Sequence, residues 1–268
     1  MHTHRFRRLF TWTCASIFAF PVIAAIGQTG SAQRERASLG PRKNSDPAPP
    51  AHSMPPAIVI GFVGGFISHD NLVHSEVQLA ARLRKDYHSG VSVETFESYH
   101  EERALKKILS LLDVDHDGTL TAPEKNQARI IIYGHSWGGS EAIALARDLE
   151  KRGIPVLLTI QVDSISKFHE NDAIIPANVA QAANFYQSAG FMHGQPKIRP
   201  ADASRTTIIG NFRFDYKASP YNCAKYPWYD RIFGKTHTQI ECDPKVWEQA
   251  ESLIRLDLPP PTLSRPAQ

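Results

Sequence analysis

Uninterrupted apolar runs alternate along this chain with segments whose apolar residues recur every three or four positions. The runs at 57–63, 129–133 and 154–162 are largely apolar, which is typical of strands buried on both faces of a parallel sheet. Residues 91–96 alternate between polar and apolar side chains, and 205–212 has a similar composition. We therefore predict five strands in these segments.

The segments between these strands have the apolar spacing of helices. This spacing predicts helices over 75–85, 101–112, 177–188 and 245–256. Pro176 directly precedes the third of them, as is common at the first turn of a helix. Strands that alternate with helices predict the α/β class, with a mostly parallel central sheet and helices on both faces.

One domain, residues 57–260, holds all of these elements. Residues 28–56 are polar and rich in proline, so they predict a flexible linker. Residues 261–268 form a short tail.

The N-terminal segment 1–27 has the order of charges and apolar residues found in secretory signal peptides. Arg5, Arg7 and Arg8 precede an apolar run that ends in small residues. We therefore predict a secreted or periplasmic protein. The alternative is an uncleaved anchor, which would hold the domain at a membrane outside the cytoplasm.

The net charge of +3 comes from that N-terminal segment. Residues 1–27 contain three basic residues and no acid, so the remainder has 27 of each. A nearly neutral chain without a basic block argues against nucleic acid as a partner.

Two cysteines, Cys223 and Cys242, lie in the predicted domain. Because an exported protein meets an oxidising compartment, we expect them to form a disulfide. The alternative is a pair of free buried thiols.

The segment 134–139, Gly-His-Ser-Trp-Gly-Gly, follows the apolar run 130–133 and precedes an alanine-rich segment at 141–149. This order predicts a strand, a tight turn that contains Ser136, and a helix. Small residues on either side of Ser136 allow a sharp turn, which would hold its hydroxyl at the carboxyl end of the sheet. The pattern matches the G-x-S-x-G nucleophile elbow. The alternative is a glycine-rich turn of another α/β domain.

A serine nucleophile needs a base to take its proton and an acid to orient that base. Asp163 directly follows the run 154–162, at the sheet edge where we expect Ser136, and Asp172 is its competitor. His237, in a predicted loop before the last helix, is the candidate base, with His169 and His193 as weaker alternatives.

The oxyanion of such a reaction needs two backbone N–H donors. One should come from Trp137, the residue after the nucleophile, and the other from the turn after the first strand. Gly65 and Phe66 both lie in that turn, and the sequence does not decide between them.

With these motifs, residues 57–256 resemble the α/β-hydrolase superfamily on its lipase and esterase side. The resemblance implies that superfamily's fold and an ester-hydrolysing activity through Ser136, Asp163 and His237. The first turn reads Gly-Gly where many members have His-Gly, a difference that leaves backbone donors in place. A superfamily with many chemistries does not define the substrate.

Residues 113–124 match the EF-hand loop at its defining positions, with acids at positions 1, 3 and 5, glycine at 6 and glutamate at 12. We predict a structural Ca²⁺ ion, and only a short helix after the loop. The alternative is an acidic surface loop. The predicted ligands are Asp113, Asp115, Asp117, Thr119, Thr121 and Glu124.

The substrate side is less defined. Residues 164–204 are long enough to form a cap, and 212–233 are rich in aromatic residues that could line an acyl pocket. A small-molecule or lipid ester is the predicted substrate. The alternatives are a thioesterase or amidase that uses the same three residues, and a secreted calcium-binding domain without catalysis.

Overall fold

The computed structural model describes residues 54–167 and 170–261. The predicted signal peptide, most of the predicted linker and all but the first residue of the predicted tail lie outside the described residues. No helix among the described residues has the length and apolar character needed to cross a membrane.

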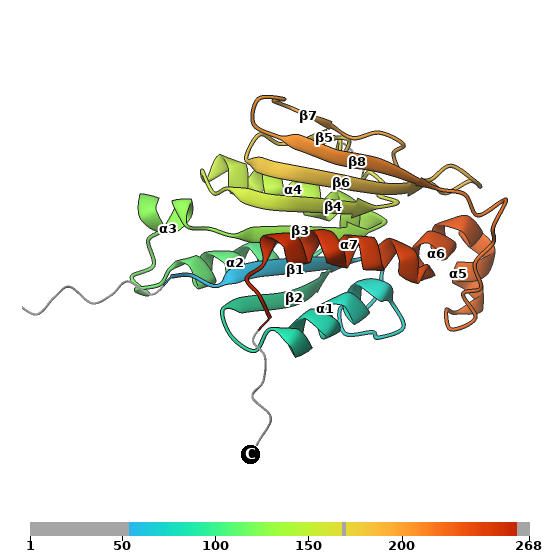
Figure 1. Ribbon diagram of the computed structural model, residues 1–268, viewed down its shortest axis with the longest axis horizontal. Helices are drawn as coiled ribbons and strands as arrows, with labels where there is room; N and C mark the ends of the chain where they lie inside the picture. Colours follow the sequence, from blue (N-terminus) through green and yellow to red (C-terminus); the bar gives the residue numbers. More distant parts are fainter. Residues whose placement is uncertain (1–53, 168–169, 262–268) are drawn as a thin grey trace, which may run out of the picture. The chain divides into compact units, whose positions relative to one another are not determined.

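Six strands form one sheet in which every neighbouring pair is parallel (Figure 1). Their order across the sheet is β2-β1-β3-β4-β6-β8. The strands are β1 (Ala57–Val63), β2 (Val91–Glu97), β3 (Ile130–His135), β4 (Val156–Val162), β6 (Val179–Gln187) and β8 (Thr207–Phe214). Two further short strands, β5 (Ile174–Ile175) and β7 (Arg199–Pro200), pair with each other.

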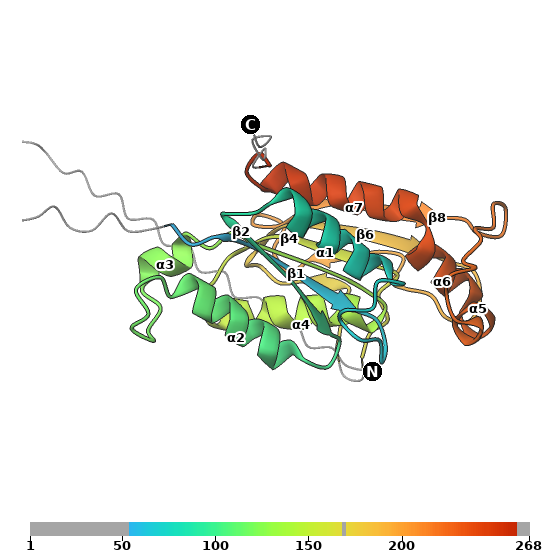
Figure 2. The same ribbon diagram turned by 90° about the horizontal axis from the view of Figure 1, so that it is seen from below.

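Helices cover both faces of this sheet. In Figure 2, α1 (Ser75–Asp86) and α7 (Pro244–Asp257) lie on one side, and α2 (Glu101–Leu112) and α4 (Trp137–Lys151) lie on the other. The predicted α/β class with a parallel sheet is therefore confirmed. The remaining helices are α3 (Ala122–Asn126), α5 (Trp228–Phe233) and α6 (Lys235–Cys242).

The central strands contribute side chains to two hydrophobic cores, one on each face of the sheet. On β1, Ile58, Ile60 and Phe62 point into the core beneath α2 and α4. Ala57 and Val59 point into the opposite core, beneath α1 and α7. Because successive side chains of a strand face opposite ways, a strand covered on both faces is apolar at most of its positions.

The helix predicted over 177–188 is wrong, because this segment forms strand β6. Its backbone pairs with β4 on one side and β8 on the other, which satisfies donors and acceptors along both edges. The apolar spacing of Val179, Ala182, Ala183 and Phe185 fits a helix, but these side chains are buried in both cores. Tertiary pairing thus overrides the local preference.

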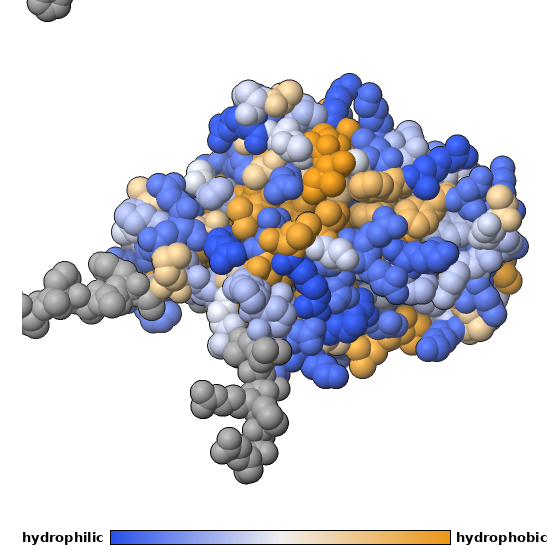
Figure 3. All heavy atoms as spheres, viewed as in Figure 1, coloured by the Kyte–Doolittle hydropathy of each residue, from blue (hydrophilic) through white to orange (hydrophobic). Residues whose placement is uncertain are grey.

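Strand β8 is one edge of the sheet, and most of its side chains are only partly buried. Figure 3 shows apolar side chains gathered in the region between β8 and α7. A groove lined by Phe185, Phe212 and Leu253, together with polar residues of α7, lies in this region.

Candidate active site

Ser136 lies between the end of β3 and the start of α4, at a backbone conformation that L-residues rarely adopt. Its φ is 57° and its ψ is −126°. The Ser136 N–H donates to the Val162 carbonyl at 3.0 Å, and the Ser136 carbonyl accepts from Ile165 N–H at 3.1 Å. The neighbouring strand end therefore holds this strained turn in place.

Close backbone packing explains the glycines of the turn. A Cβ atom on Gly134 would lie 2.3 Å from the Gly138 carbonyl oxygen, and one on Gly138 would lie 2.3 Å from the Phe62 carbonyl oxygen. Helix α4 thus begins in contact with β3 and β1. This contact leaves no room for a side chain at either position.

Asp163 follows β4 directly and accepts hydrogen bonds on both carboxylate oxygens. Its Oδ1 accepts from the Gly194 N–H at 2.7 Å, and its Oδ2 accepts from Gln187 Nε2 at 2.9 Å. His237 Nδ1 lies 2.7 Å from Oδ2. Burial by itself would raise the pKa of Asp163, but the bond and charge of His237, with the other donors, hold it below its usual range.

His237 lies in helix α6 and not in the predicted loop. Burial, followed by the charge of the neighbouring His135, holds the pKa of His237 below its usual value against the opposing effect of Asp163. Its ring centroid is 4.5 Å from that of His135. A lowered pKa keeps the imidazole neutral at neutral pH, which is the state that a general base needs.

The competing acid and base candidates, where the structure describes them, have partners outside the pair of Asp163 and His237. Asp172 is buried and accepts from the hydroxyls of Ser164 and Ser166. His193 lies 3.2 Å from the Gly194 carbonyl oxygen, and His169 lies outside the described residues. The structure thus places Asp163, and not Asp172, against His237.

A cavity of about 340 Å³ contains both Ser136 and His237 in its wall. The predicted oxyanion donors Gly65, Phe66 and Trp137 line the same cavity. Trp137 is the first residue of α4, so its N–H has no acceptor within the helix. Gly65 has a φ of 49°, a conformation that glycine adopts without strain.

The aromatic residues of the segments 164–204 and 212–233, predicted to form a cap or an acyl pocket, do not line this cavity where the structure describes them. Met192 lines the cavity, but Phe191 is 99% exposed and Phe185 is in the core. Tyr216 and Tyr226 from the aromatic segment are buried and do not line the cavity. Its apolar wall instead consists of Phe66, Ile67, Trp137, Ile165 and Met192.

Cys223 and Cys242 form a disulfide with a Cα–Cα distance of 5.8 Å. Cys242 is the last residue of α6, the helix that contains His237. The bond therefore links that helix to the segment before α5.

Part of the predicted calcium loop is assembled. Oxygen atoms of Asp113, Asp115 and Glu124 lie within 4.8 Å of one another. Asp117 is not part of this group, and its Oδ1 accepts from the Thr119 N–H at 2.7 Å. Thr121 caps the short helix α3 through its hydroxyl, in a capping box with Glu124. The exit helix has five residues, in keeping with the short helix that the sequence predicts.

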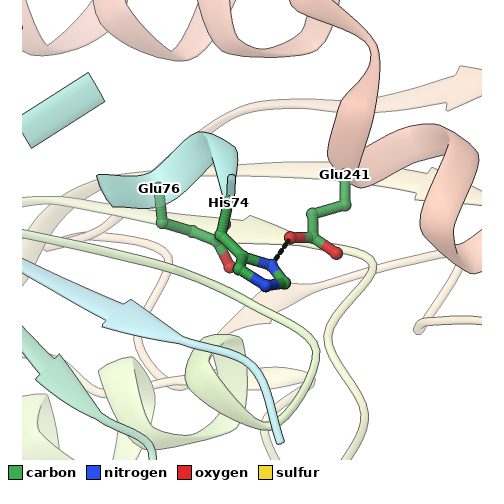
Figure 4. A group of neighbouring side chains, drawn as sticks. All are labelled: His74, Glu76 and Glu241. Carbon is green, nitrogen blue, oxygen red and sulfur yellow. Dashed lines mark hydrogen bonds and ion pairs between the residues drawn. The ribbon is translucent and has the colours of Figure 1, made fainter. Parts of the chain in front are cut away.

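Sequence reasoning missed a buried cluster next to this site. His74 and Glu76 at the start of α1 face Glu241 of α6, and His74 Nδ1 is 2.6 Å from Glu241 Oε1 (Figure 4). His135, beside the nucleophile, completes the cluster. Since α1 and α6 lie far apart in the sequence, only the His-x-Glu spacing at 74–76 was available as a local pattern.

No protein-family model matches the chain, and no curated protein matches it. Several solved structures are similar at low identity, among them the following three. RedJ with a PEG molecule in its active site has a TM-score of 0.38 and 14% identity, over 76% of this chain and 98% of that chain. The RedJ thioesterase from the prodiginine biosynthetic pathway in Streptomyces coelicolor has a TM-score of 0.35 and 11% identity, over 72% and 96%.

The third similar structure is described as a hydrolase of the alpha/beta superfamily from Xanthomonas campestris pv. campestris. Its TM-score is 0.29 and its identity 12%, over 60% of this chain and 90% of that chain. At such low scores, these proteins carry no conclusion about function for this chain.

Proposed function

We propose that this protein is an exported serine hydrolase that cleaves carboxylic esters through Ser136, Asp163 and His237. The observation that carries the proposal is the pairing of His237 with the buried Asp163 beside a cavity that also contains the strained Ser136. An acid, a base and a serine hydroxyl beside a cavity, all at one end of a parallel sheet, are the groups that acyl transfer requires.

In the first step, Ser136 Oγ attacks the carbonyl carbon while His237 Nε2 takes the hydroxyl proton. The developing oxyanion accepts from the Trp137 N–H and from the N–H of Gly65 or Phe66. When the tetrahedral intermediate collapses, His237 returns the proton to the leaving alcohol and an acyl-enzyme remains. Water, deprotonated by His237, then releases the acid and restores Ser136.

The apolar wall of the cavity favours a substrate with an apolar acyl group. Phe66 is 85% exposed, and its ring contacts that of Trp137 at a centroid distance of 5.5 Å. A thioester or an amide would use the same three residues, so turnover of a matched panel of esters, thioesters and amides is the comparison that separates these substrate classes.

Labelling with a fluorophosphonate probe tests the proposal. Such a probe should attach to Ser136, and Ser136→Ala should abolish both the label and ester hydrolysis. Ser140→Ala is the matched control, because Ser140 lies in the first turn of α4, the helix that begins directly after Ser136, and its hydroxyl donates to Glu170. A folded protein that takes no label would favour a calcium-binding domain without catalysis.

We also propose that the loop 113–124 binds a structural Ca²⁺ ion. The assembled oxygens of Asp113, Asp115 and Glu124 support it, as does Asp113 Oδ1, which is buried without a hydrogen-bond partner among the described residues. The carboxylate of Asp117 and the oxygens of Thr119 and Thr121 would complete the set of oxygen ligands. The ion would fix the connection from α2 to β3, which leads to Ser136.

Thermal melting with added Ca²⁺ tests this second proposal. Ca²⁺ should raise the melting temperature of the wild-type protein and leave that of Asp115→Asn almost unchanged, with Mg²⁺ as the ion control. An identical melting temperature of the wild-type protein with and without Ca²⁺ would contradict the proposal.

Export is the remaining part of the proposed function, and it rests on the composition of residues 1–27. The mass of the purified mature chain tests it. Loss of about the first 27–32 residues would show cleavage of a signal peptide, whereas an intact N-terminus in the membrane fraction would indicate an anchor.

A further inference from the structure

The cluster of His74, Glu76, His135 and Glu241 is a set of four ionisable side chains that are almost fully buried. Their exposed fractions are 2%, 0%, 2% and 4%. None of them has a role in the proposed hydrolysis. The cluster therefore needs its own physical explanation, because two buried carboxylates are costly unless charge and hydrogen bonds compensate them.

Hydrogen bonds among the described residues supply only part of that compensation, through the contact of His74 Nδ1 with Glu241 Oε1 at 2.6 Å. Both carboxylate oxygens of Glu76 and both ring nitrogens of His135 are buried without a hydrogen-bond partner there. His135 Nδ1 lies 3.6 Å from Glu76 Oε1 and 3.5 Å from Glu241 Oε2. These atoms face one another across gaps too long for good hydrogen bonds.

The two gaps around His135 fit a shared metal ion better than they fit hydrogen bonds. Two ligands of a tetrahedral ion with metal–ligand bonds of 2.0–2.1 Å lie about 3.3 Å apart. Ligand atoms of His74, Glu76 and Glu241 also lie within 4.8 Å of one another. Figure 4 shows His74 and Glu76 of α1 beside Glu241 of α6, with all three side chains converging.

From this arrangement we propose that His74, Glu76, His135 and Glu241 bind one divalent transition-metal ion, with Zn²⁺ as the best fit. Imidazole nitrogens are borderline ligands that suit Zn²⁺, carboxylate oxygens also bind it, and two of each would give it four-coordination. Two glutamates would also balance its charge. The site is distinct from the calcium loop and does not depend on the proposed hydrolysis.

The surroundings hold the ligands in place. Tyr133 Oη donates to the Glu76 backbone carbonyl at 2.9 Å, and Trp247 Nε1 donates to the Glu241 backbone carbonyl at 2.5 Å. His135 and Glu241 also line the cavity at Ser136, which gives an ion a route into the site. A bound ion would link α1 to α6, the helix that positions His237.

The test uses the full-length protein in excess Ca²⁺, so that the calcium loop remains saturated. After treatment with a zinc chelator, the protein should bind one equivalent of Zn²⁺, and Co²⁺ should give the visible absorption of a tetrahedral site. Glu76→Gln and Glu241→Gln should each weaken Zn²⁺ binding by at least about 100-fold, since even partners outside the ligand set change affinity by 10–100-fold.

Glu97→Gln is the matched control. Glu97 is also a buried carboxylate between two histidines, but His69 and His100 satisfy it at 2.7 Å each. This variant should bind Zn²⁺ like the wild type. Equal loss in Glu97→Gln, unchanged binding in both cluster variants, or no bound metal in the wild-type protein would each overturn the proposal.

X-ray absorption of the wild-type zinc protein keeps the test decisive if the cluster variants do not fold. A first shell of four nitrogen and oxygen atoms at 2.0–2.1 Å with imidazole scattering is expected. A shell of six oxygens, or sulfur ligands, would contradict the proposed set.

Discussion

Ser136 and Asp163 are two of the three described residues other than glycine with positive φ, at 57° and 42°. Both stand at the carboxyl ends of neighbouring strands, where the chain turns sharply out of the sheet. Strain of this kind persists only where surrounding structure holds it, and it is often found at functional sites. The hydrogen bonds of Ser136 to the end of β4 and its following turn serve this purpose.

The first prediction concerns the acid. Asp163→Asn should lower kcat by roughly 10³–10⁴-fold with little change in KM, because an amide no longer fixes the orientation and tautomer of His237. Steady-state kinetics with the best ester substrate of the panel measures both kcat and KM. Asp172→Asn should leave kcat nearly unchanged and lower stability instead, since the Asp172 carboxylate accepts from the hydroxyls of Ser164 and Ser166, whereas His237 pairs with Asp163. The reverse ranking of the two variants would assign the acid to Asp172.

At the scale of elements, the turn between β3 and α4 depends on contact between backbones. Glycine at 138 is required by the nearness of β1, whereas glycine at 153 is required only by its φ angle. Gly153, at the end of α4, has a φ of 68°, and a Cβ atom added there would have no described atom within 4 Å.

This difference gives the second prediction. Gly138→Ala should lower the free energy of unfolding by about 3 kcal/mol or more, because its Cβ would overlap the Phe62 carbonyl. Gly153→Ala should cost only about 1 kcal/mol, from backbone strain alone. Urea unfolding of both variants is the measurement. Similar losses in the two would mean that the turn relaxes around an added side chain.

Helix α2 begins with a carboxyl group in an unfavourable place. Burial and the nearby charges of Glu141 and Asp148 raise the pKa of Glu101 to about 7. A folded-state pKa above the unfolded one adds stability below about pH 4.5, and that stability is lost as the pH rises through 7. Glu101 is thus destabilising in its charged form.

The third prediction follows from that sign. Glu101→Gln should raise stability at pH 8, by about 1 kcal/mol once solvent screening is allowed for, and have little effect at pH 4. Thermal melts at the two pH values measure it. Glu102→Gln, in the same turn but exposed, should bring no gain at either pH. A gain at pH 4 that equals the gain at pH 8 would show that charge is not the cause.

For the molecule as a whole, the disulfide joins the segment before α5 to the end of α6 and closes a loop with a sequence separation of 19. A loop of this size contributes about 3 kcal/mol in the chain-entropy model. It also limits the movement of the helix that contains His237.

The fourth prediction is that reduction of this bond lowers the melting temperature by roughly 6–12 °C. Loss of ester hydrolysis should begin at a lower temperature than in the oxidised protein. The Cys223→Ser, Cys242→Ser double variant should behave like the reduced protein and should not respond to reductant. If stability and activity are the same with and without the bond, the disulfide has no such role.

The sequence by itself determined the features that depend on neighbouring residues. The strands of the sheet centre appear as largely apolar runs, since a strand covered on both faces is apolar at most of its positions. The turn at Ser136 appears because its glycines and its nucleophile are consecutive. The predicted calcium loop can be recognised in the sequence for the same reason, since all its predicted ligands fall within twelve residues.

Tertiary structure decided what depends on residues far apart in the chain. Segment 179–187 became a strand because β4 and β8 both pair with its backbone, although its apolar spacing also suits a helix. The choice of Asp163 over Asp172 needed the position of His237, 74 residues away. The cluster of His74 and Glu241 joins side chains 167 positions apart, so no local pattern could have revealed it. The sequence of neighbouring residues largely determines which elements form, and tertiary packing determines which of their side chains contact one another.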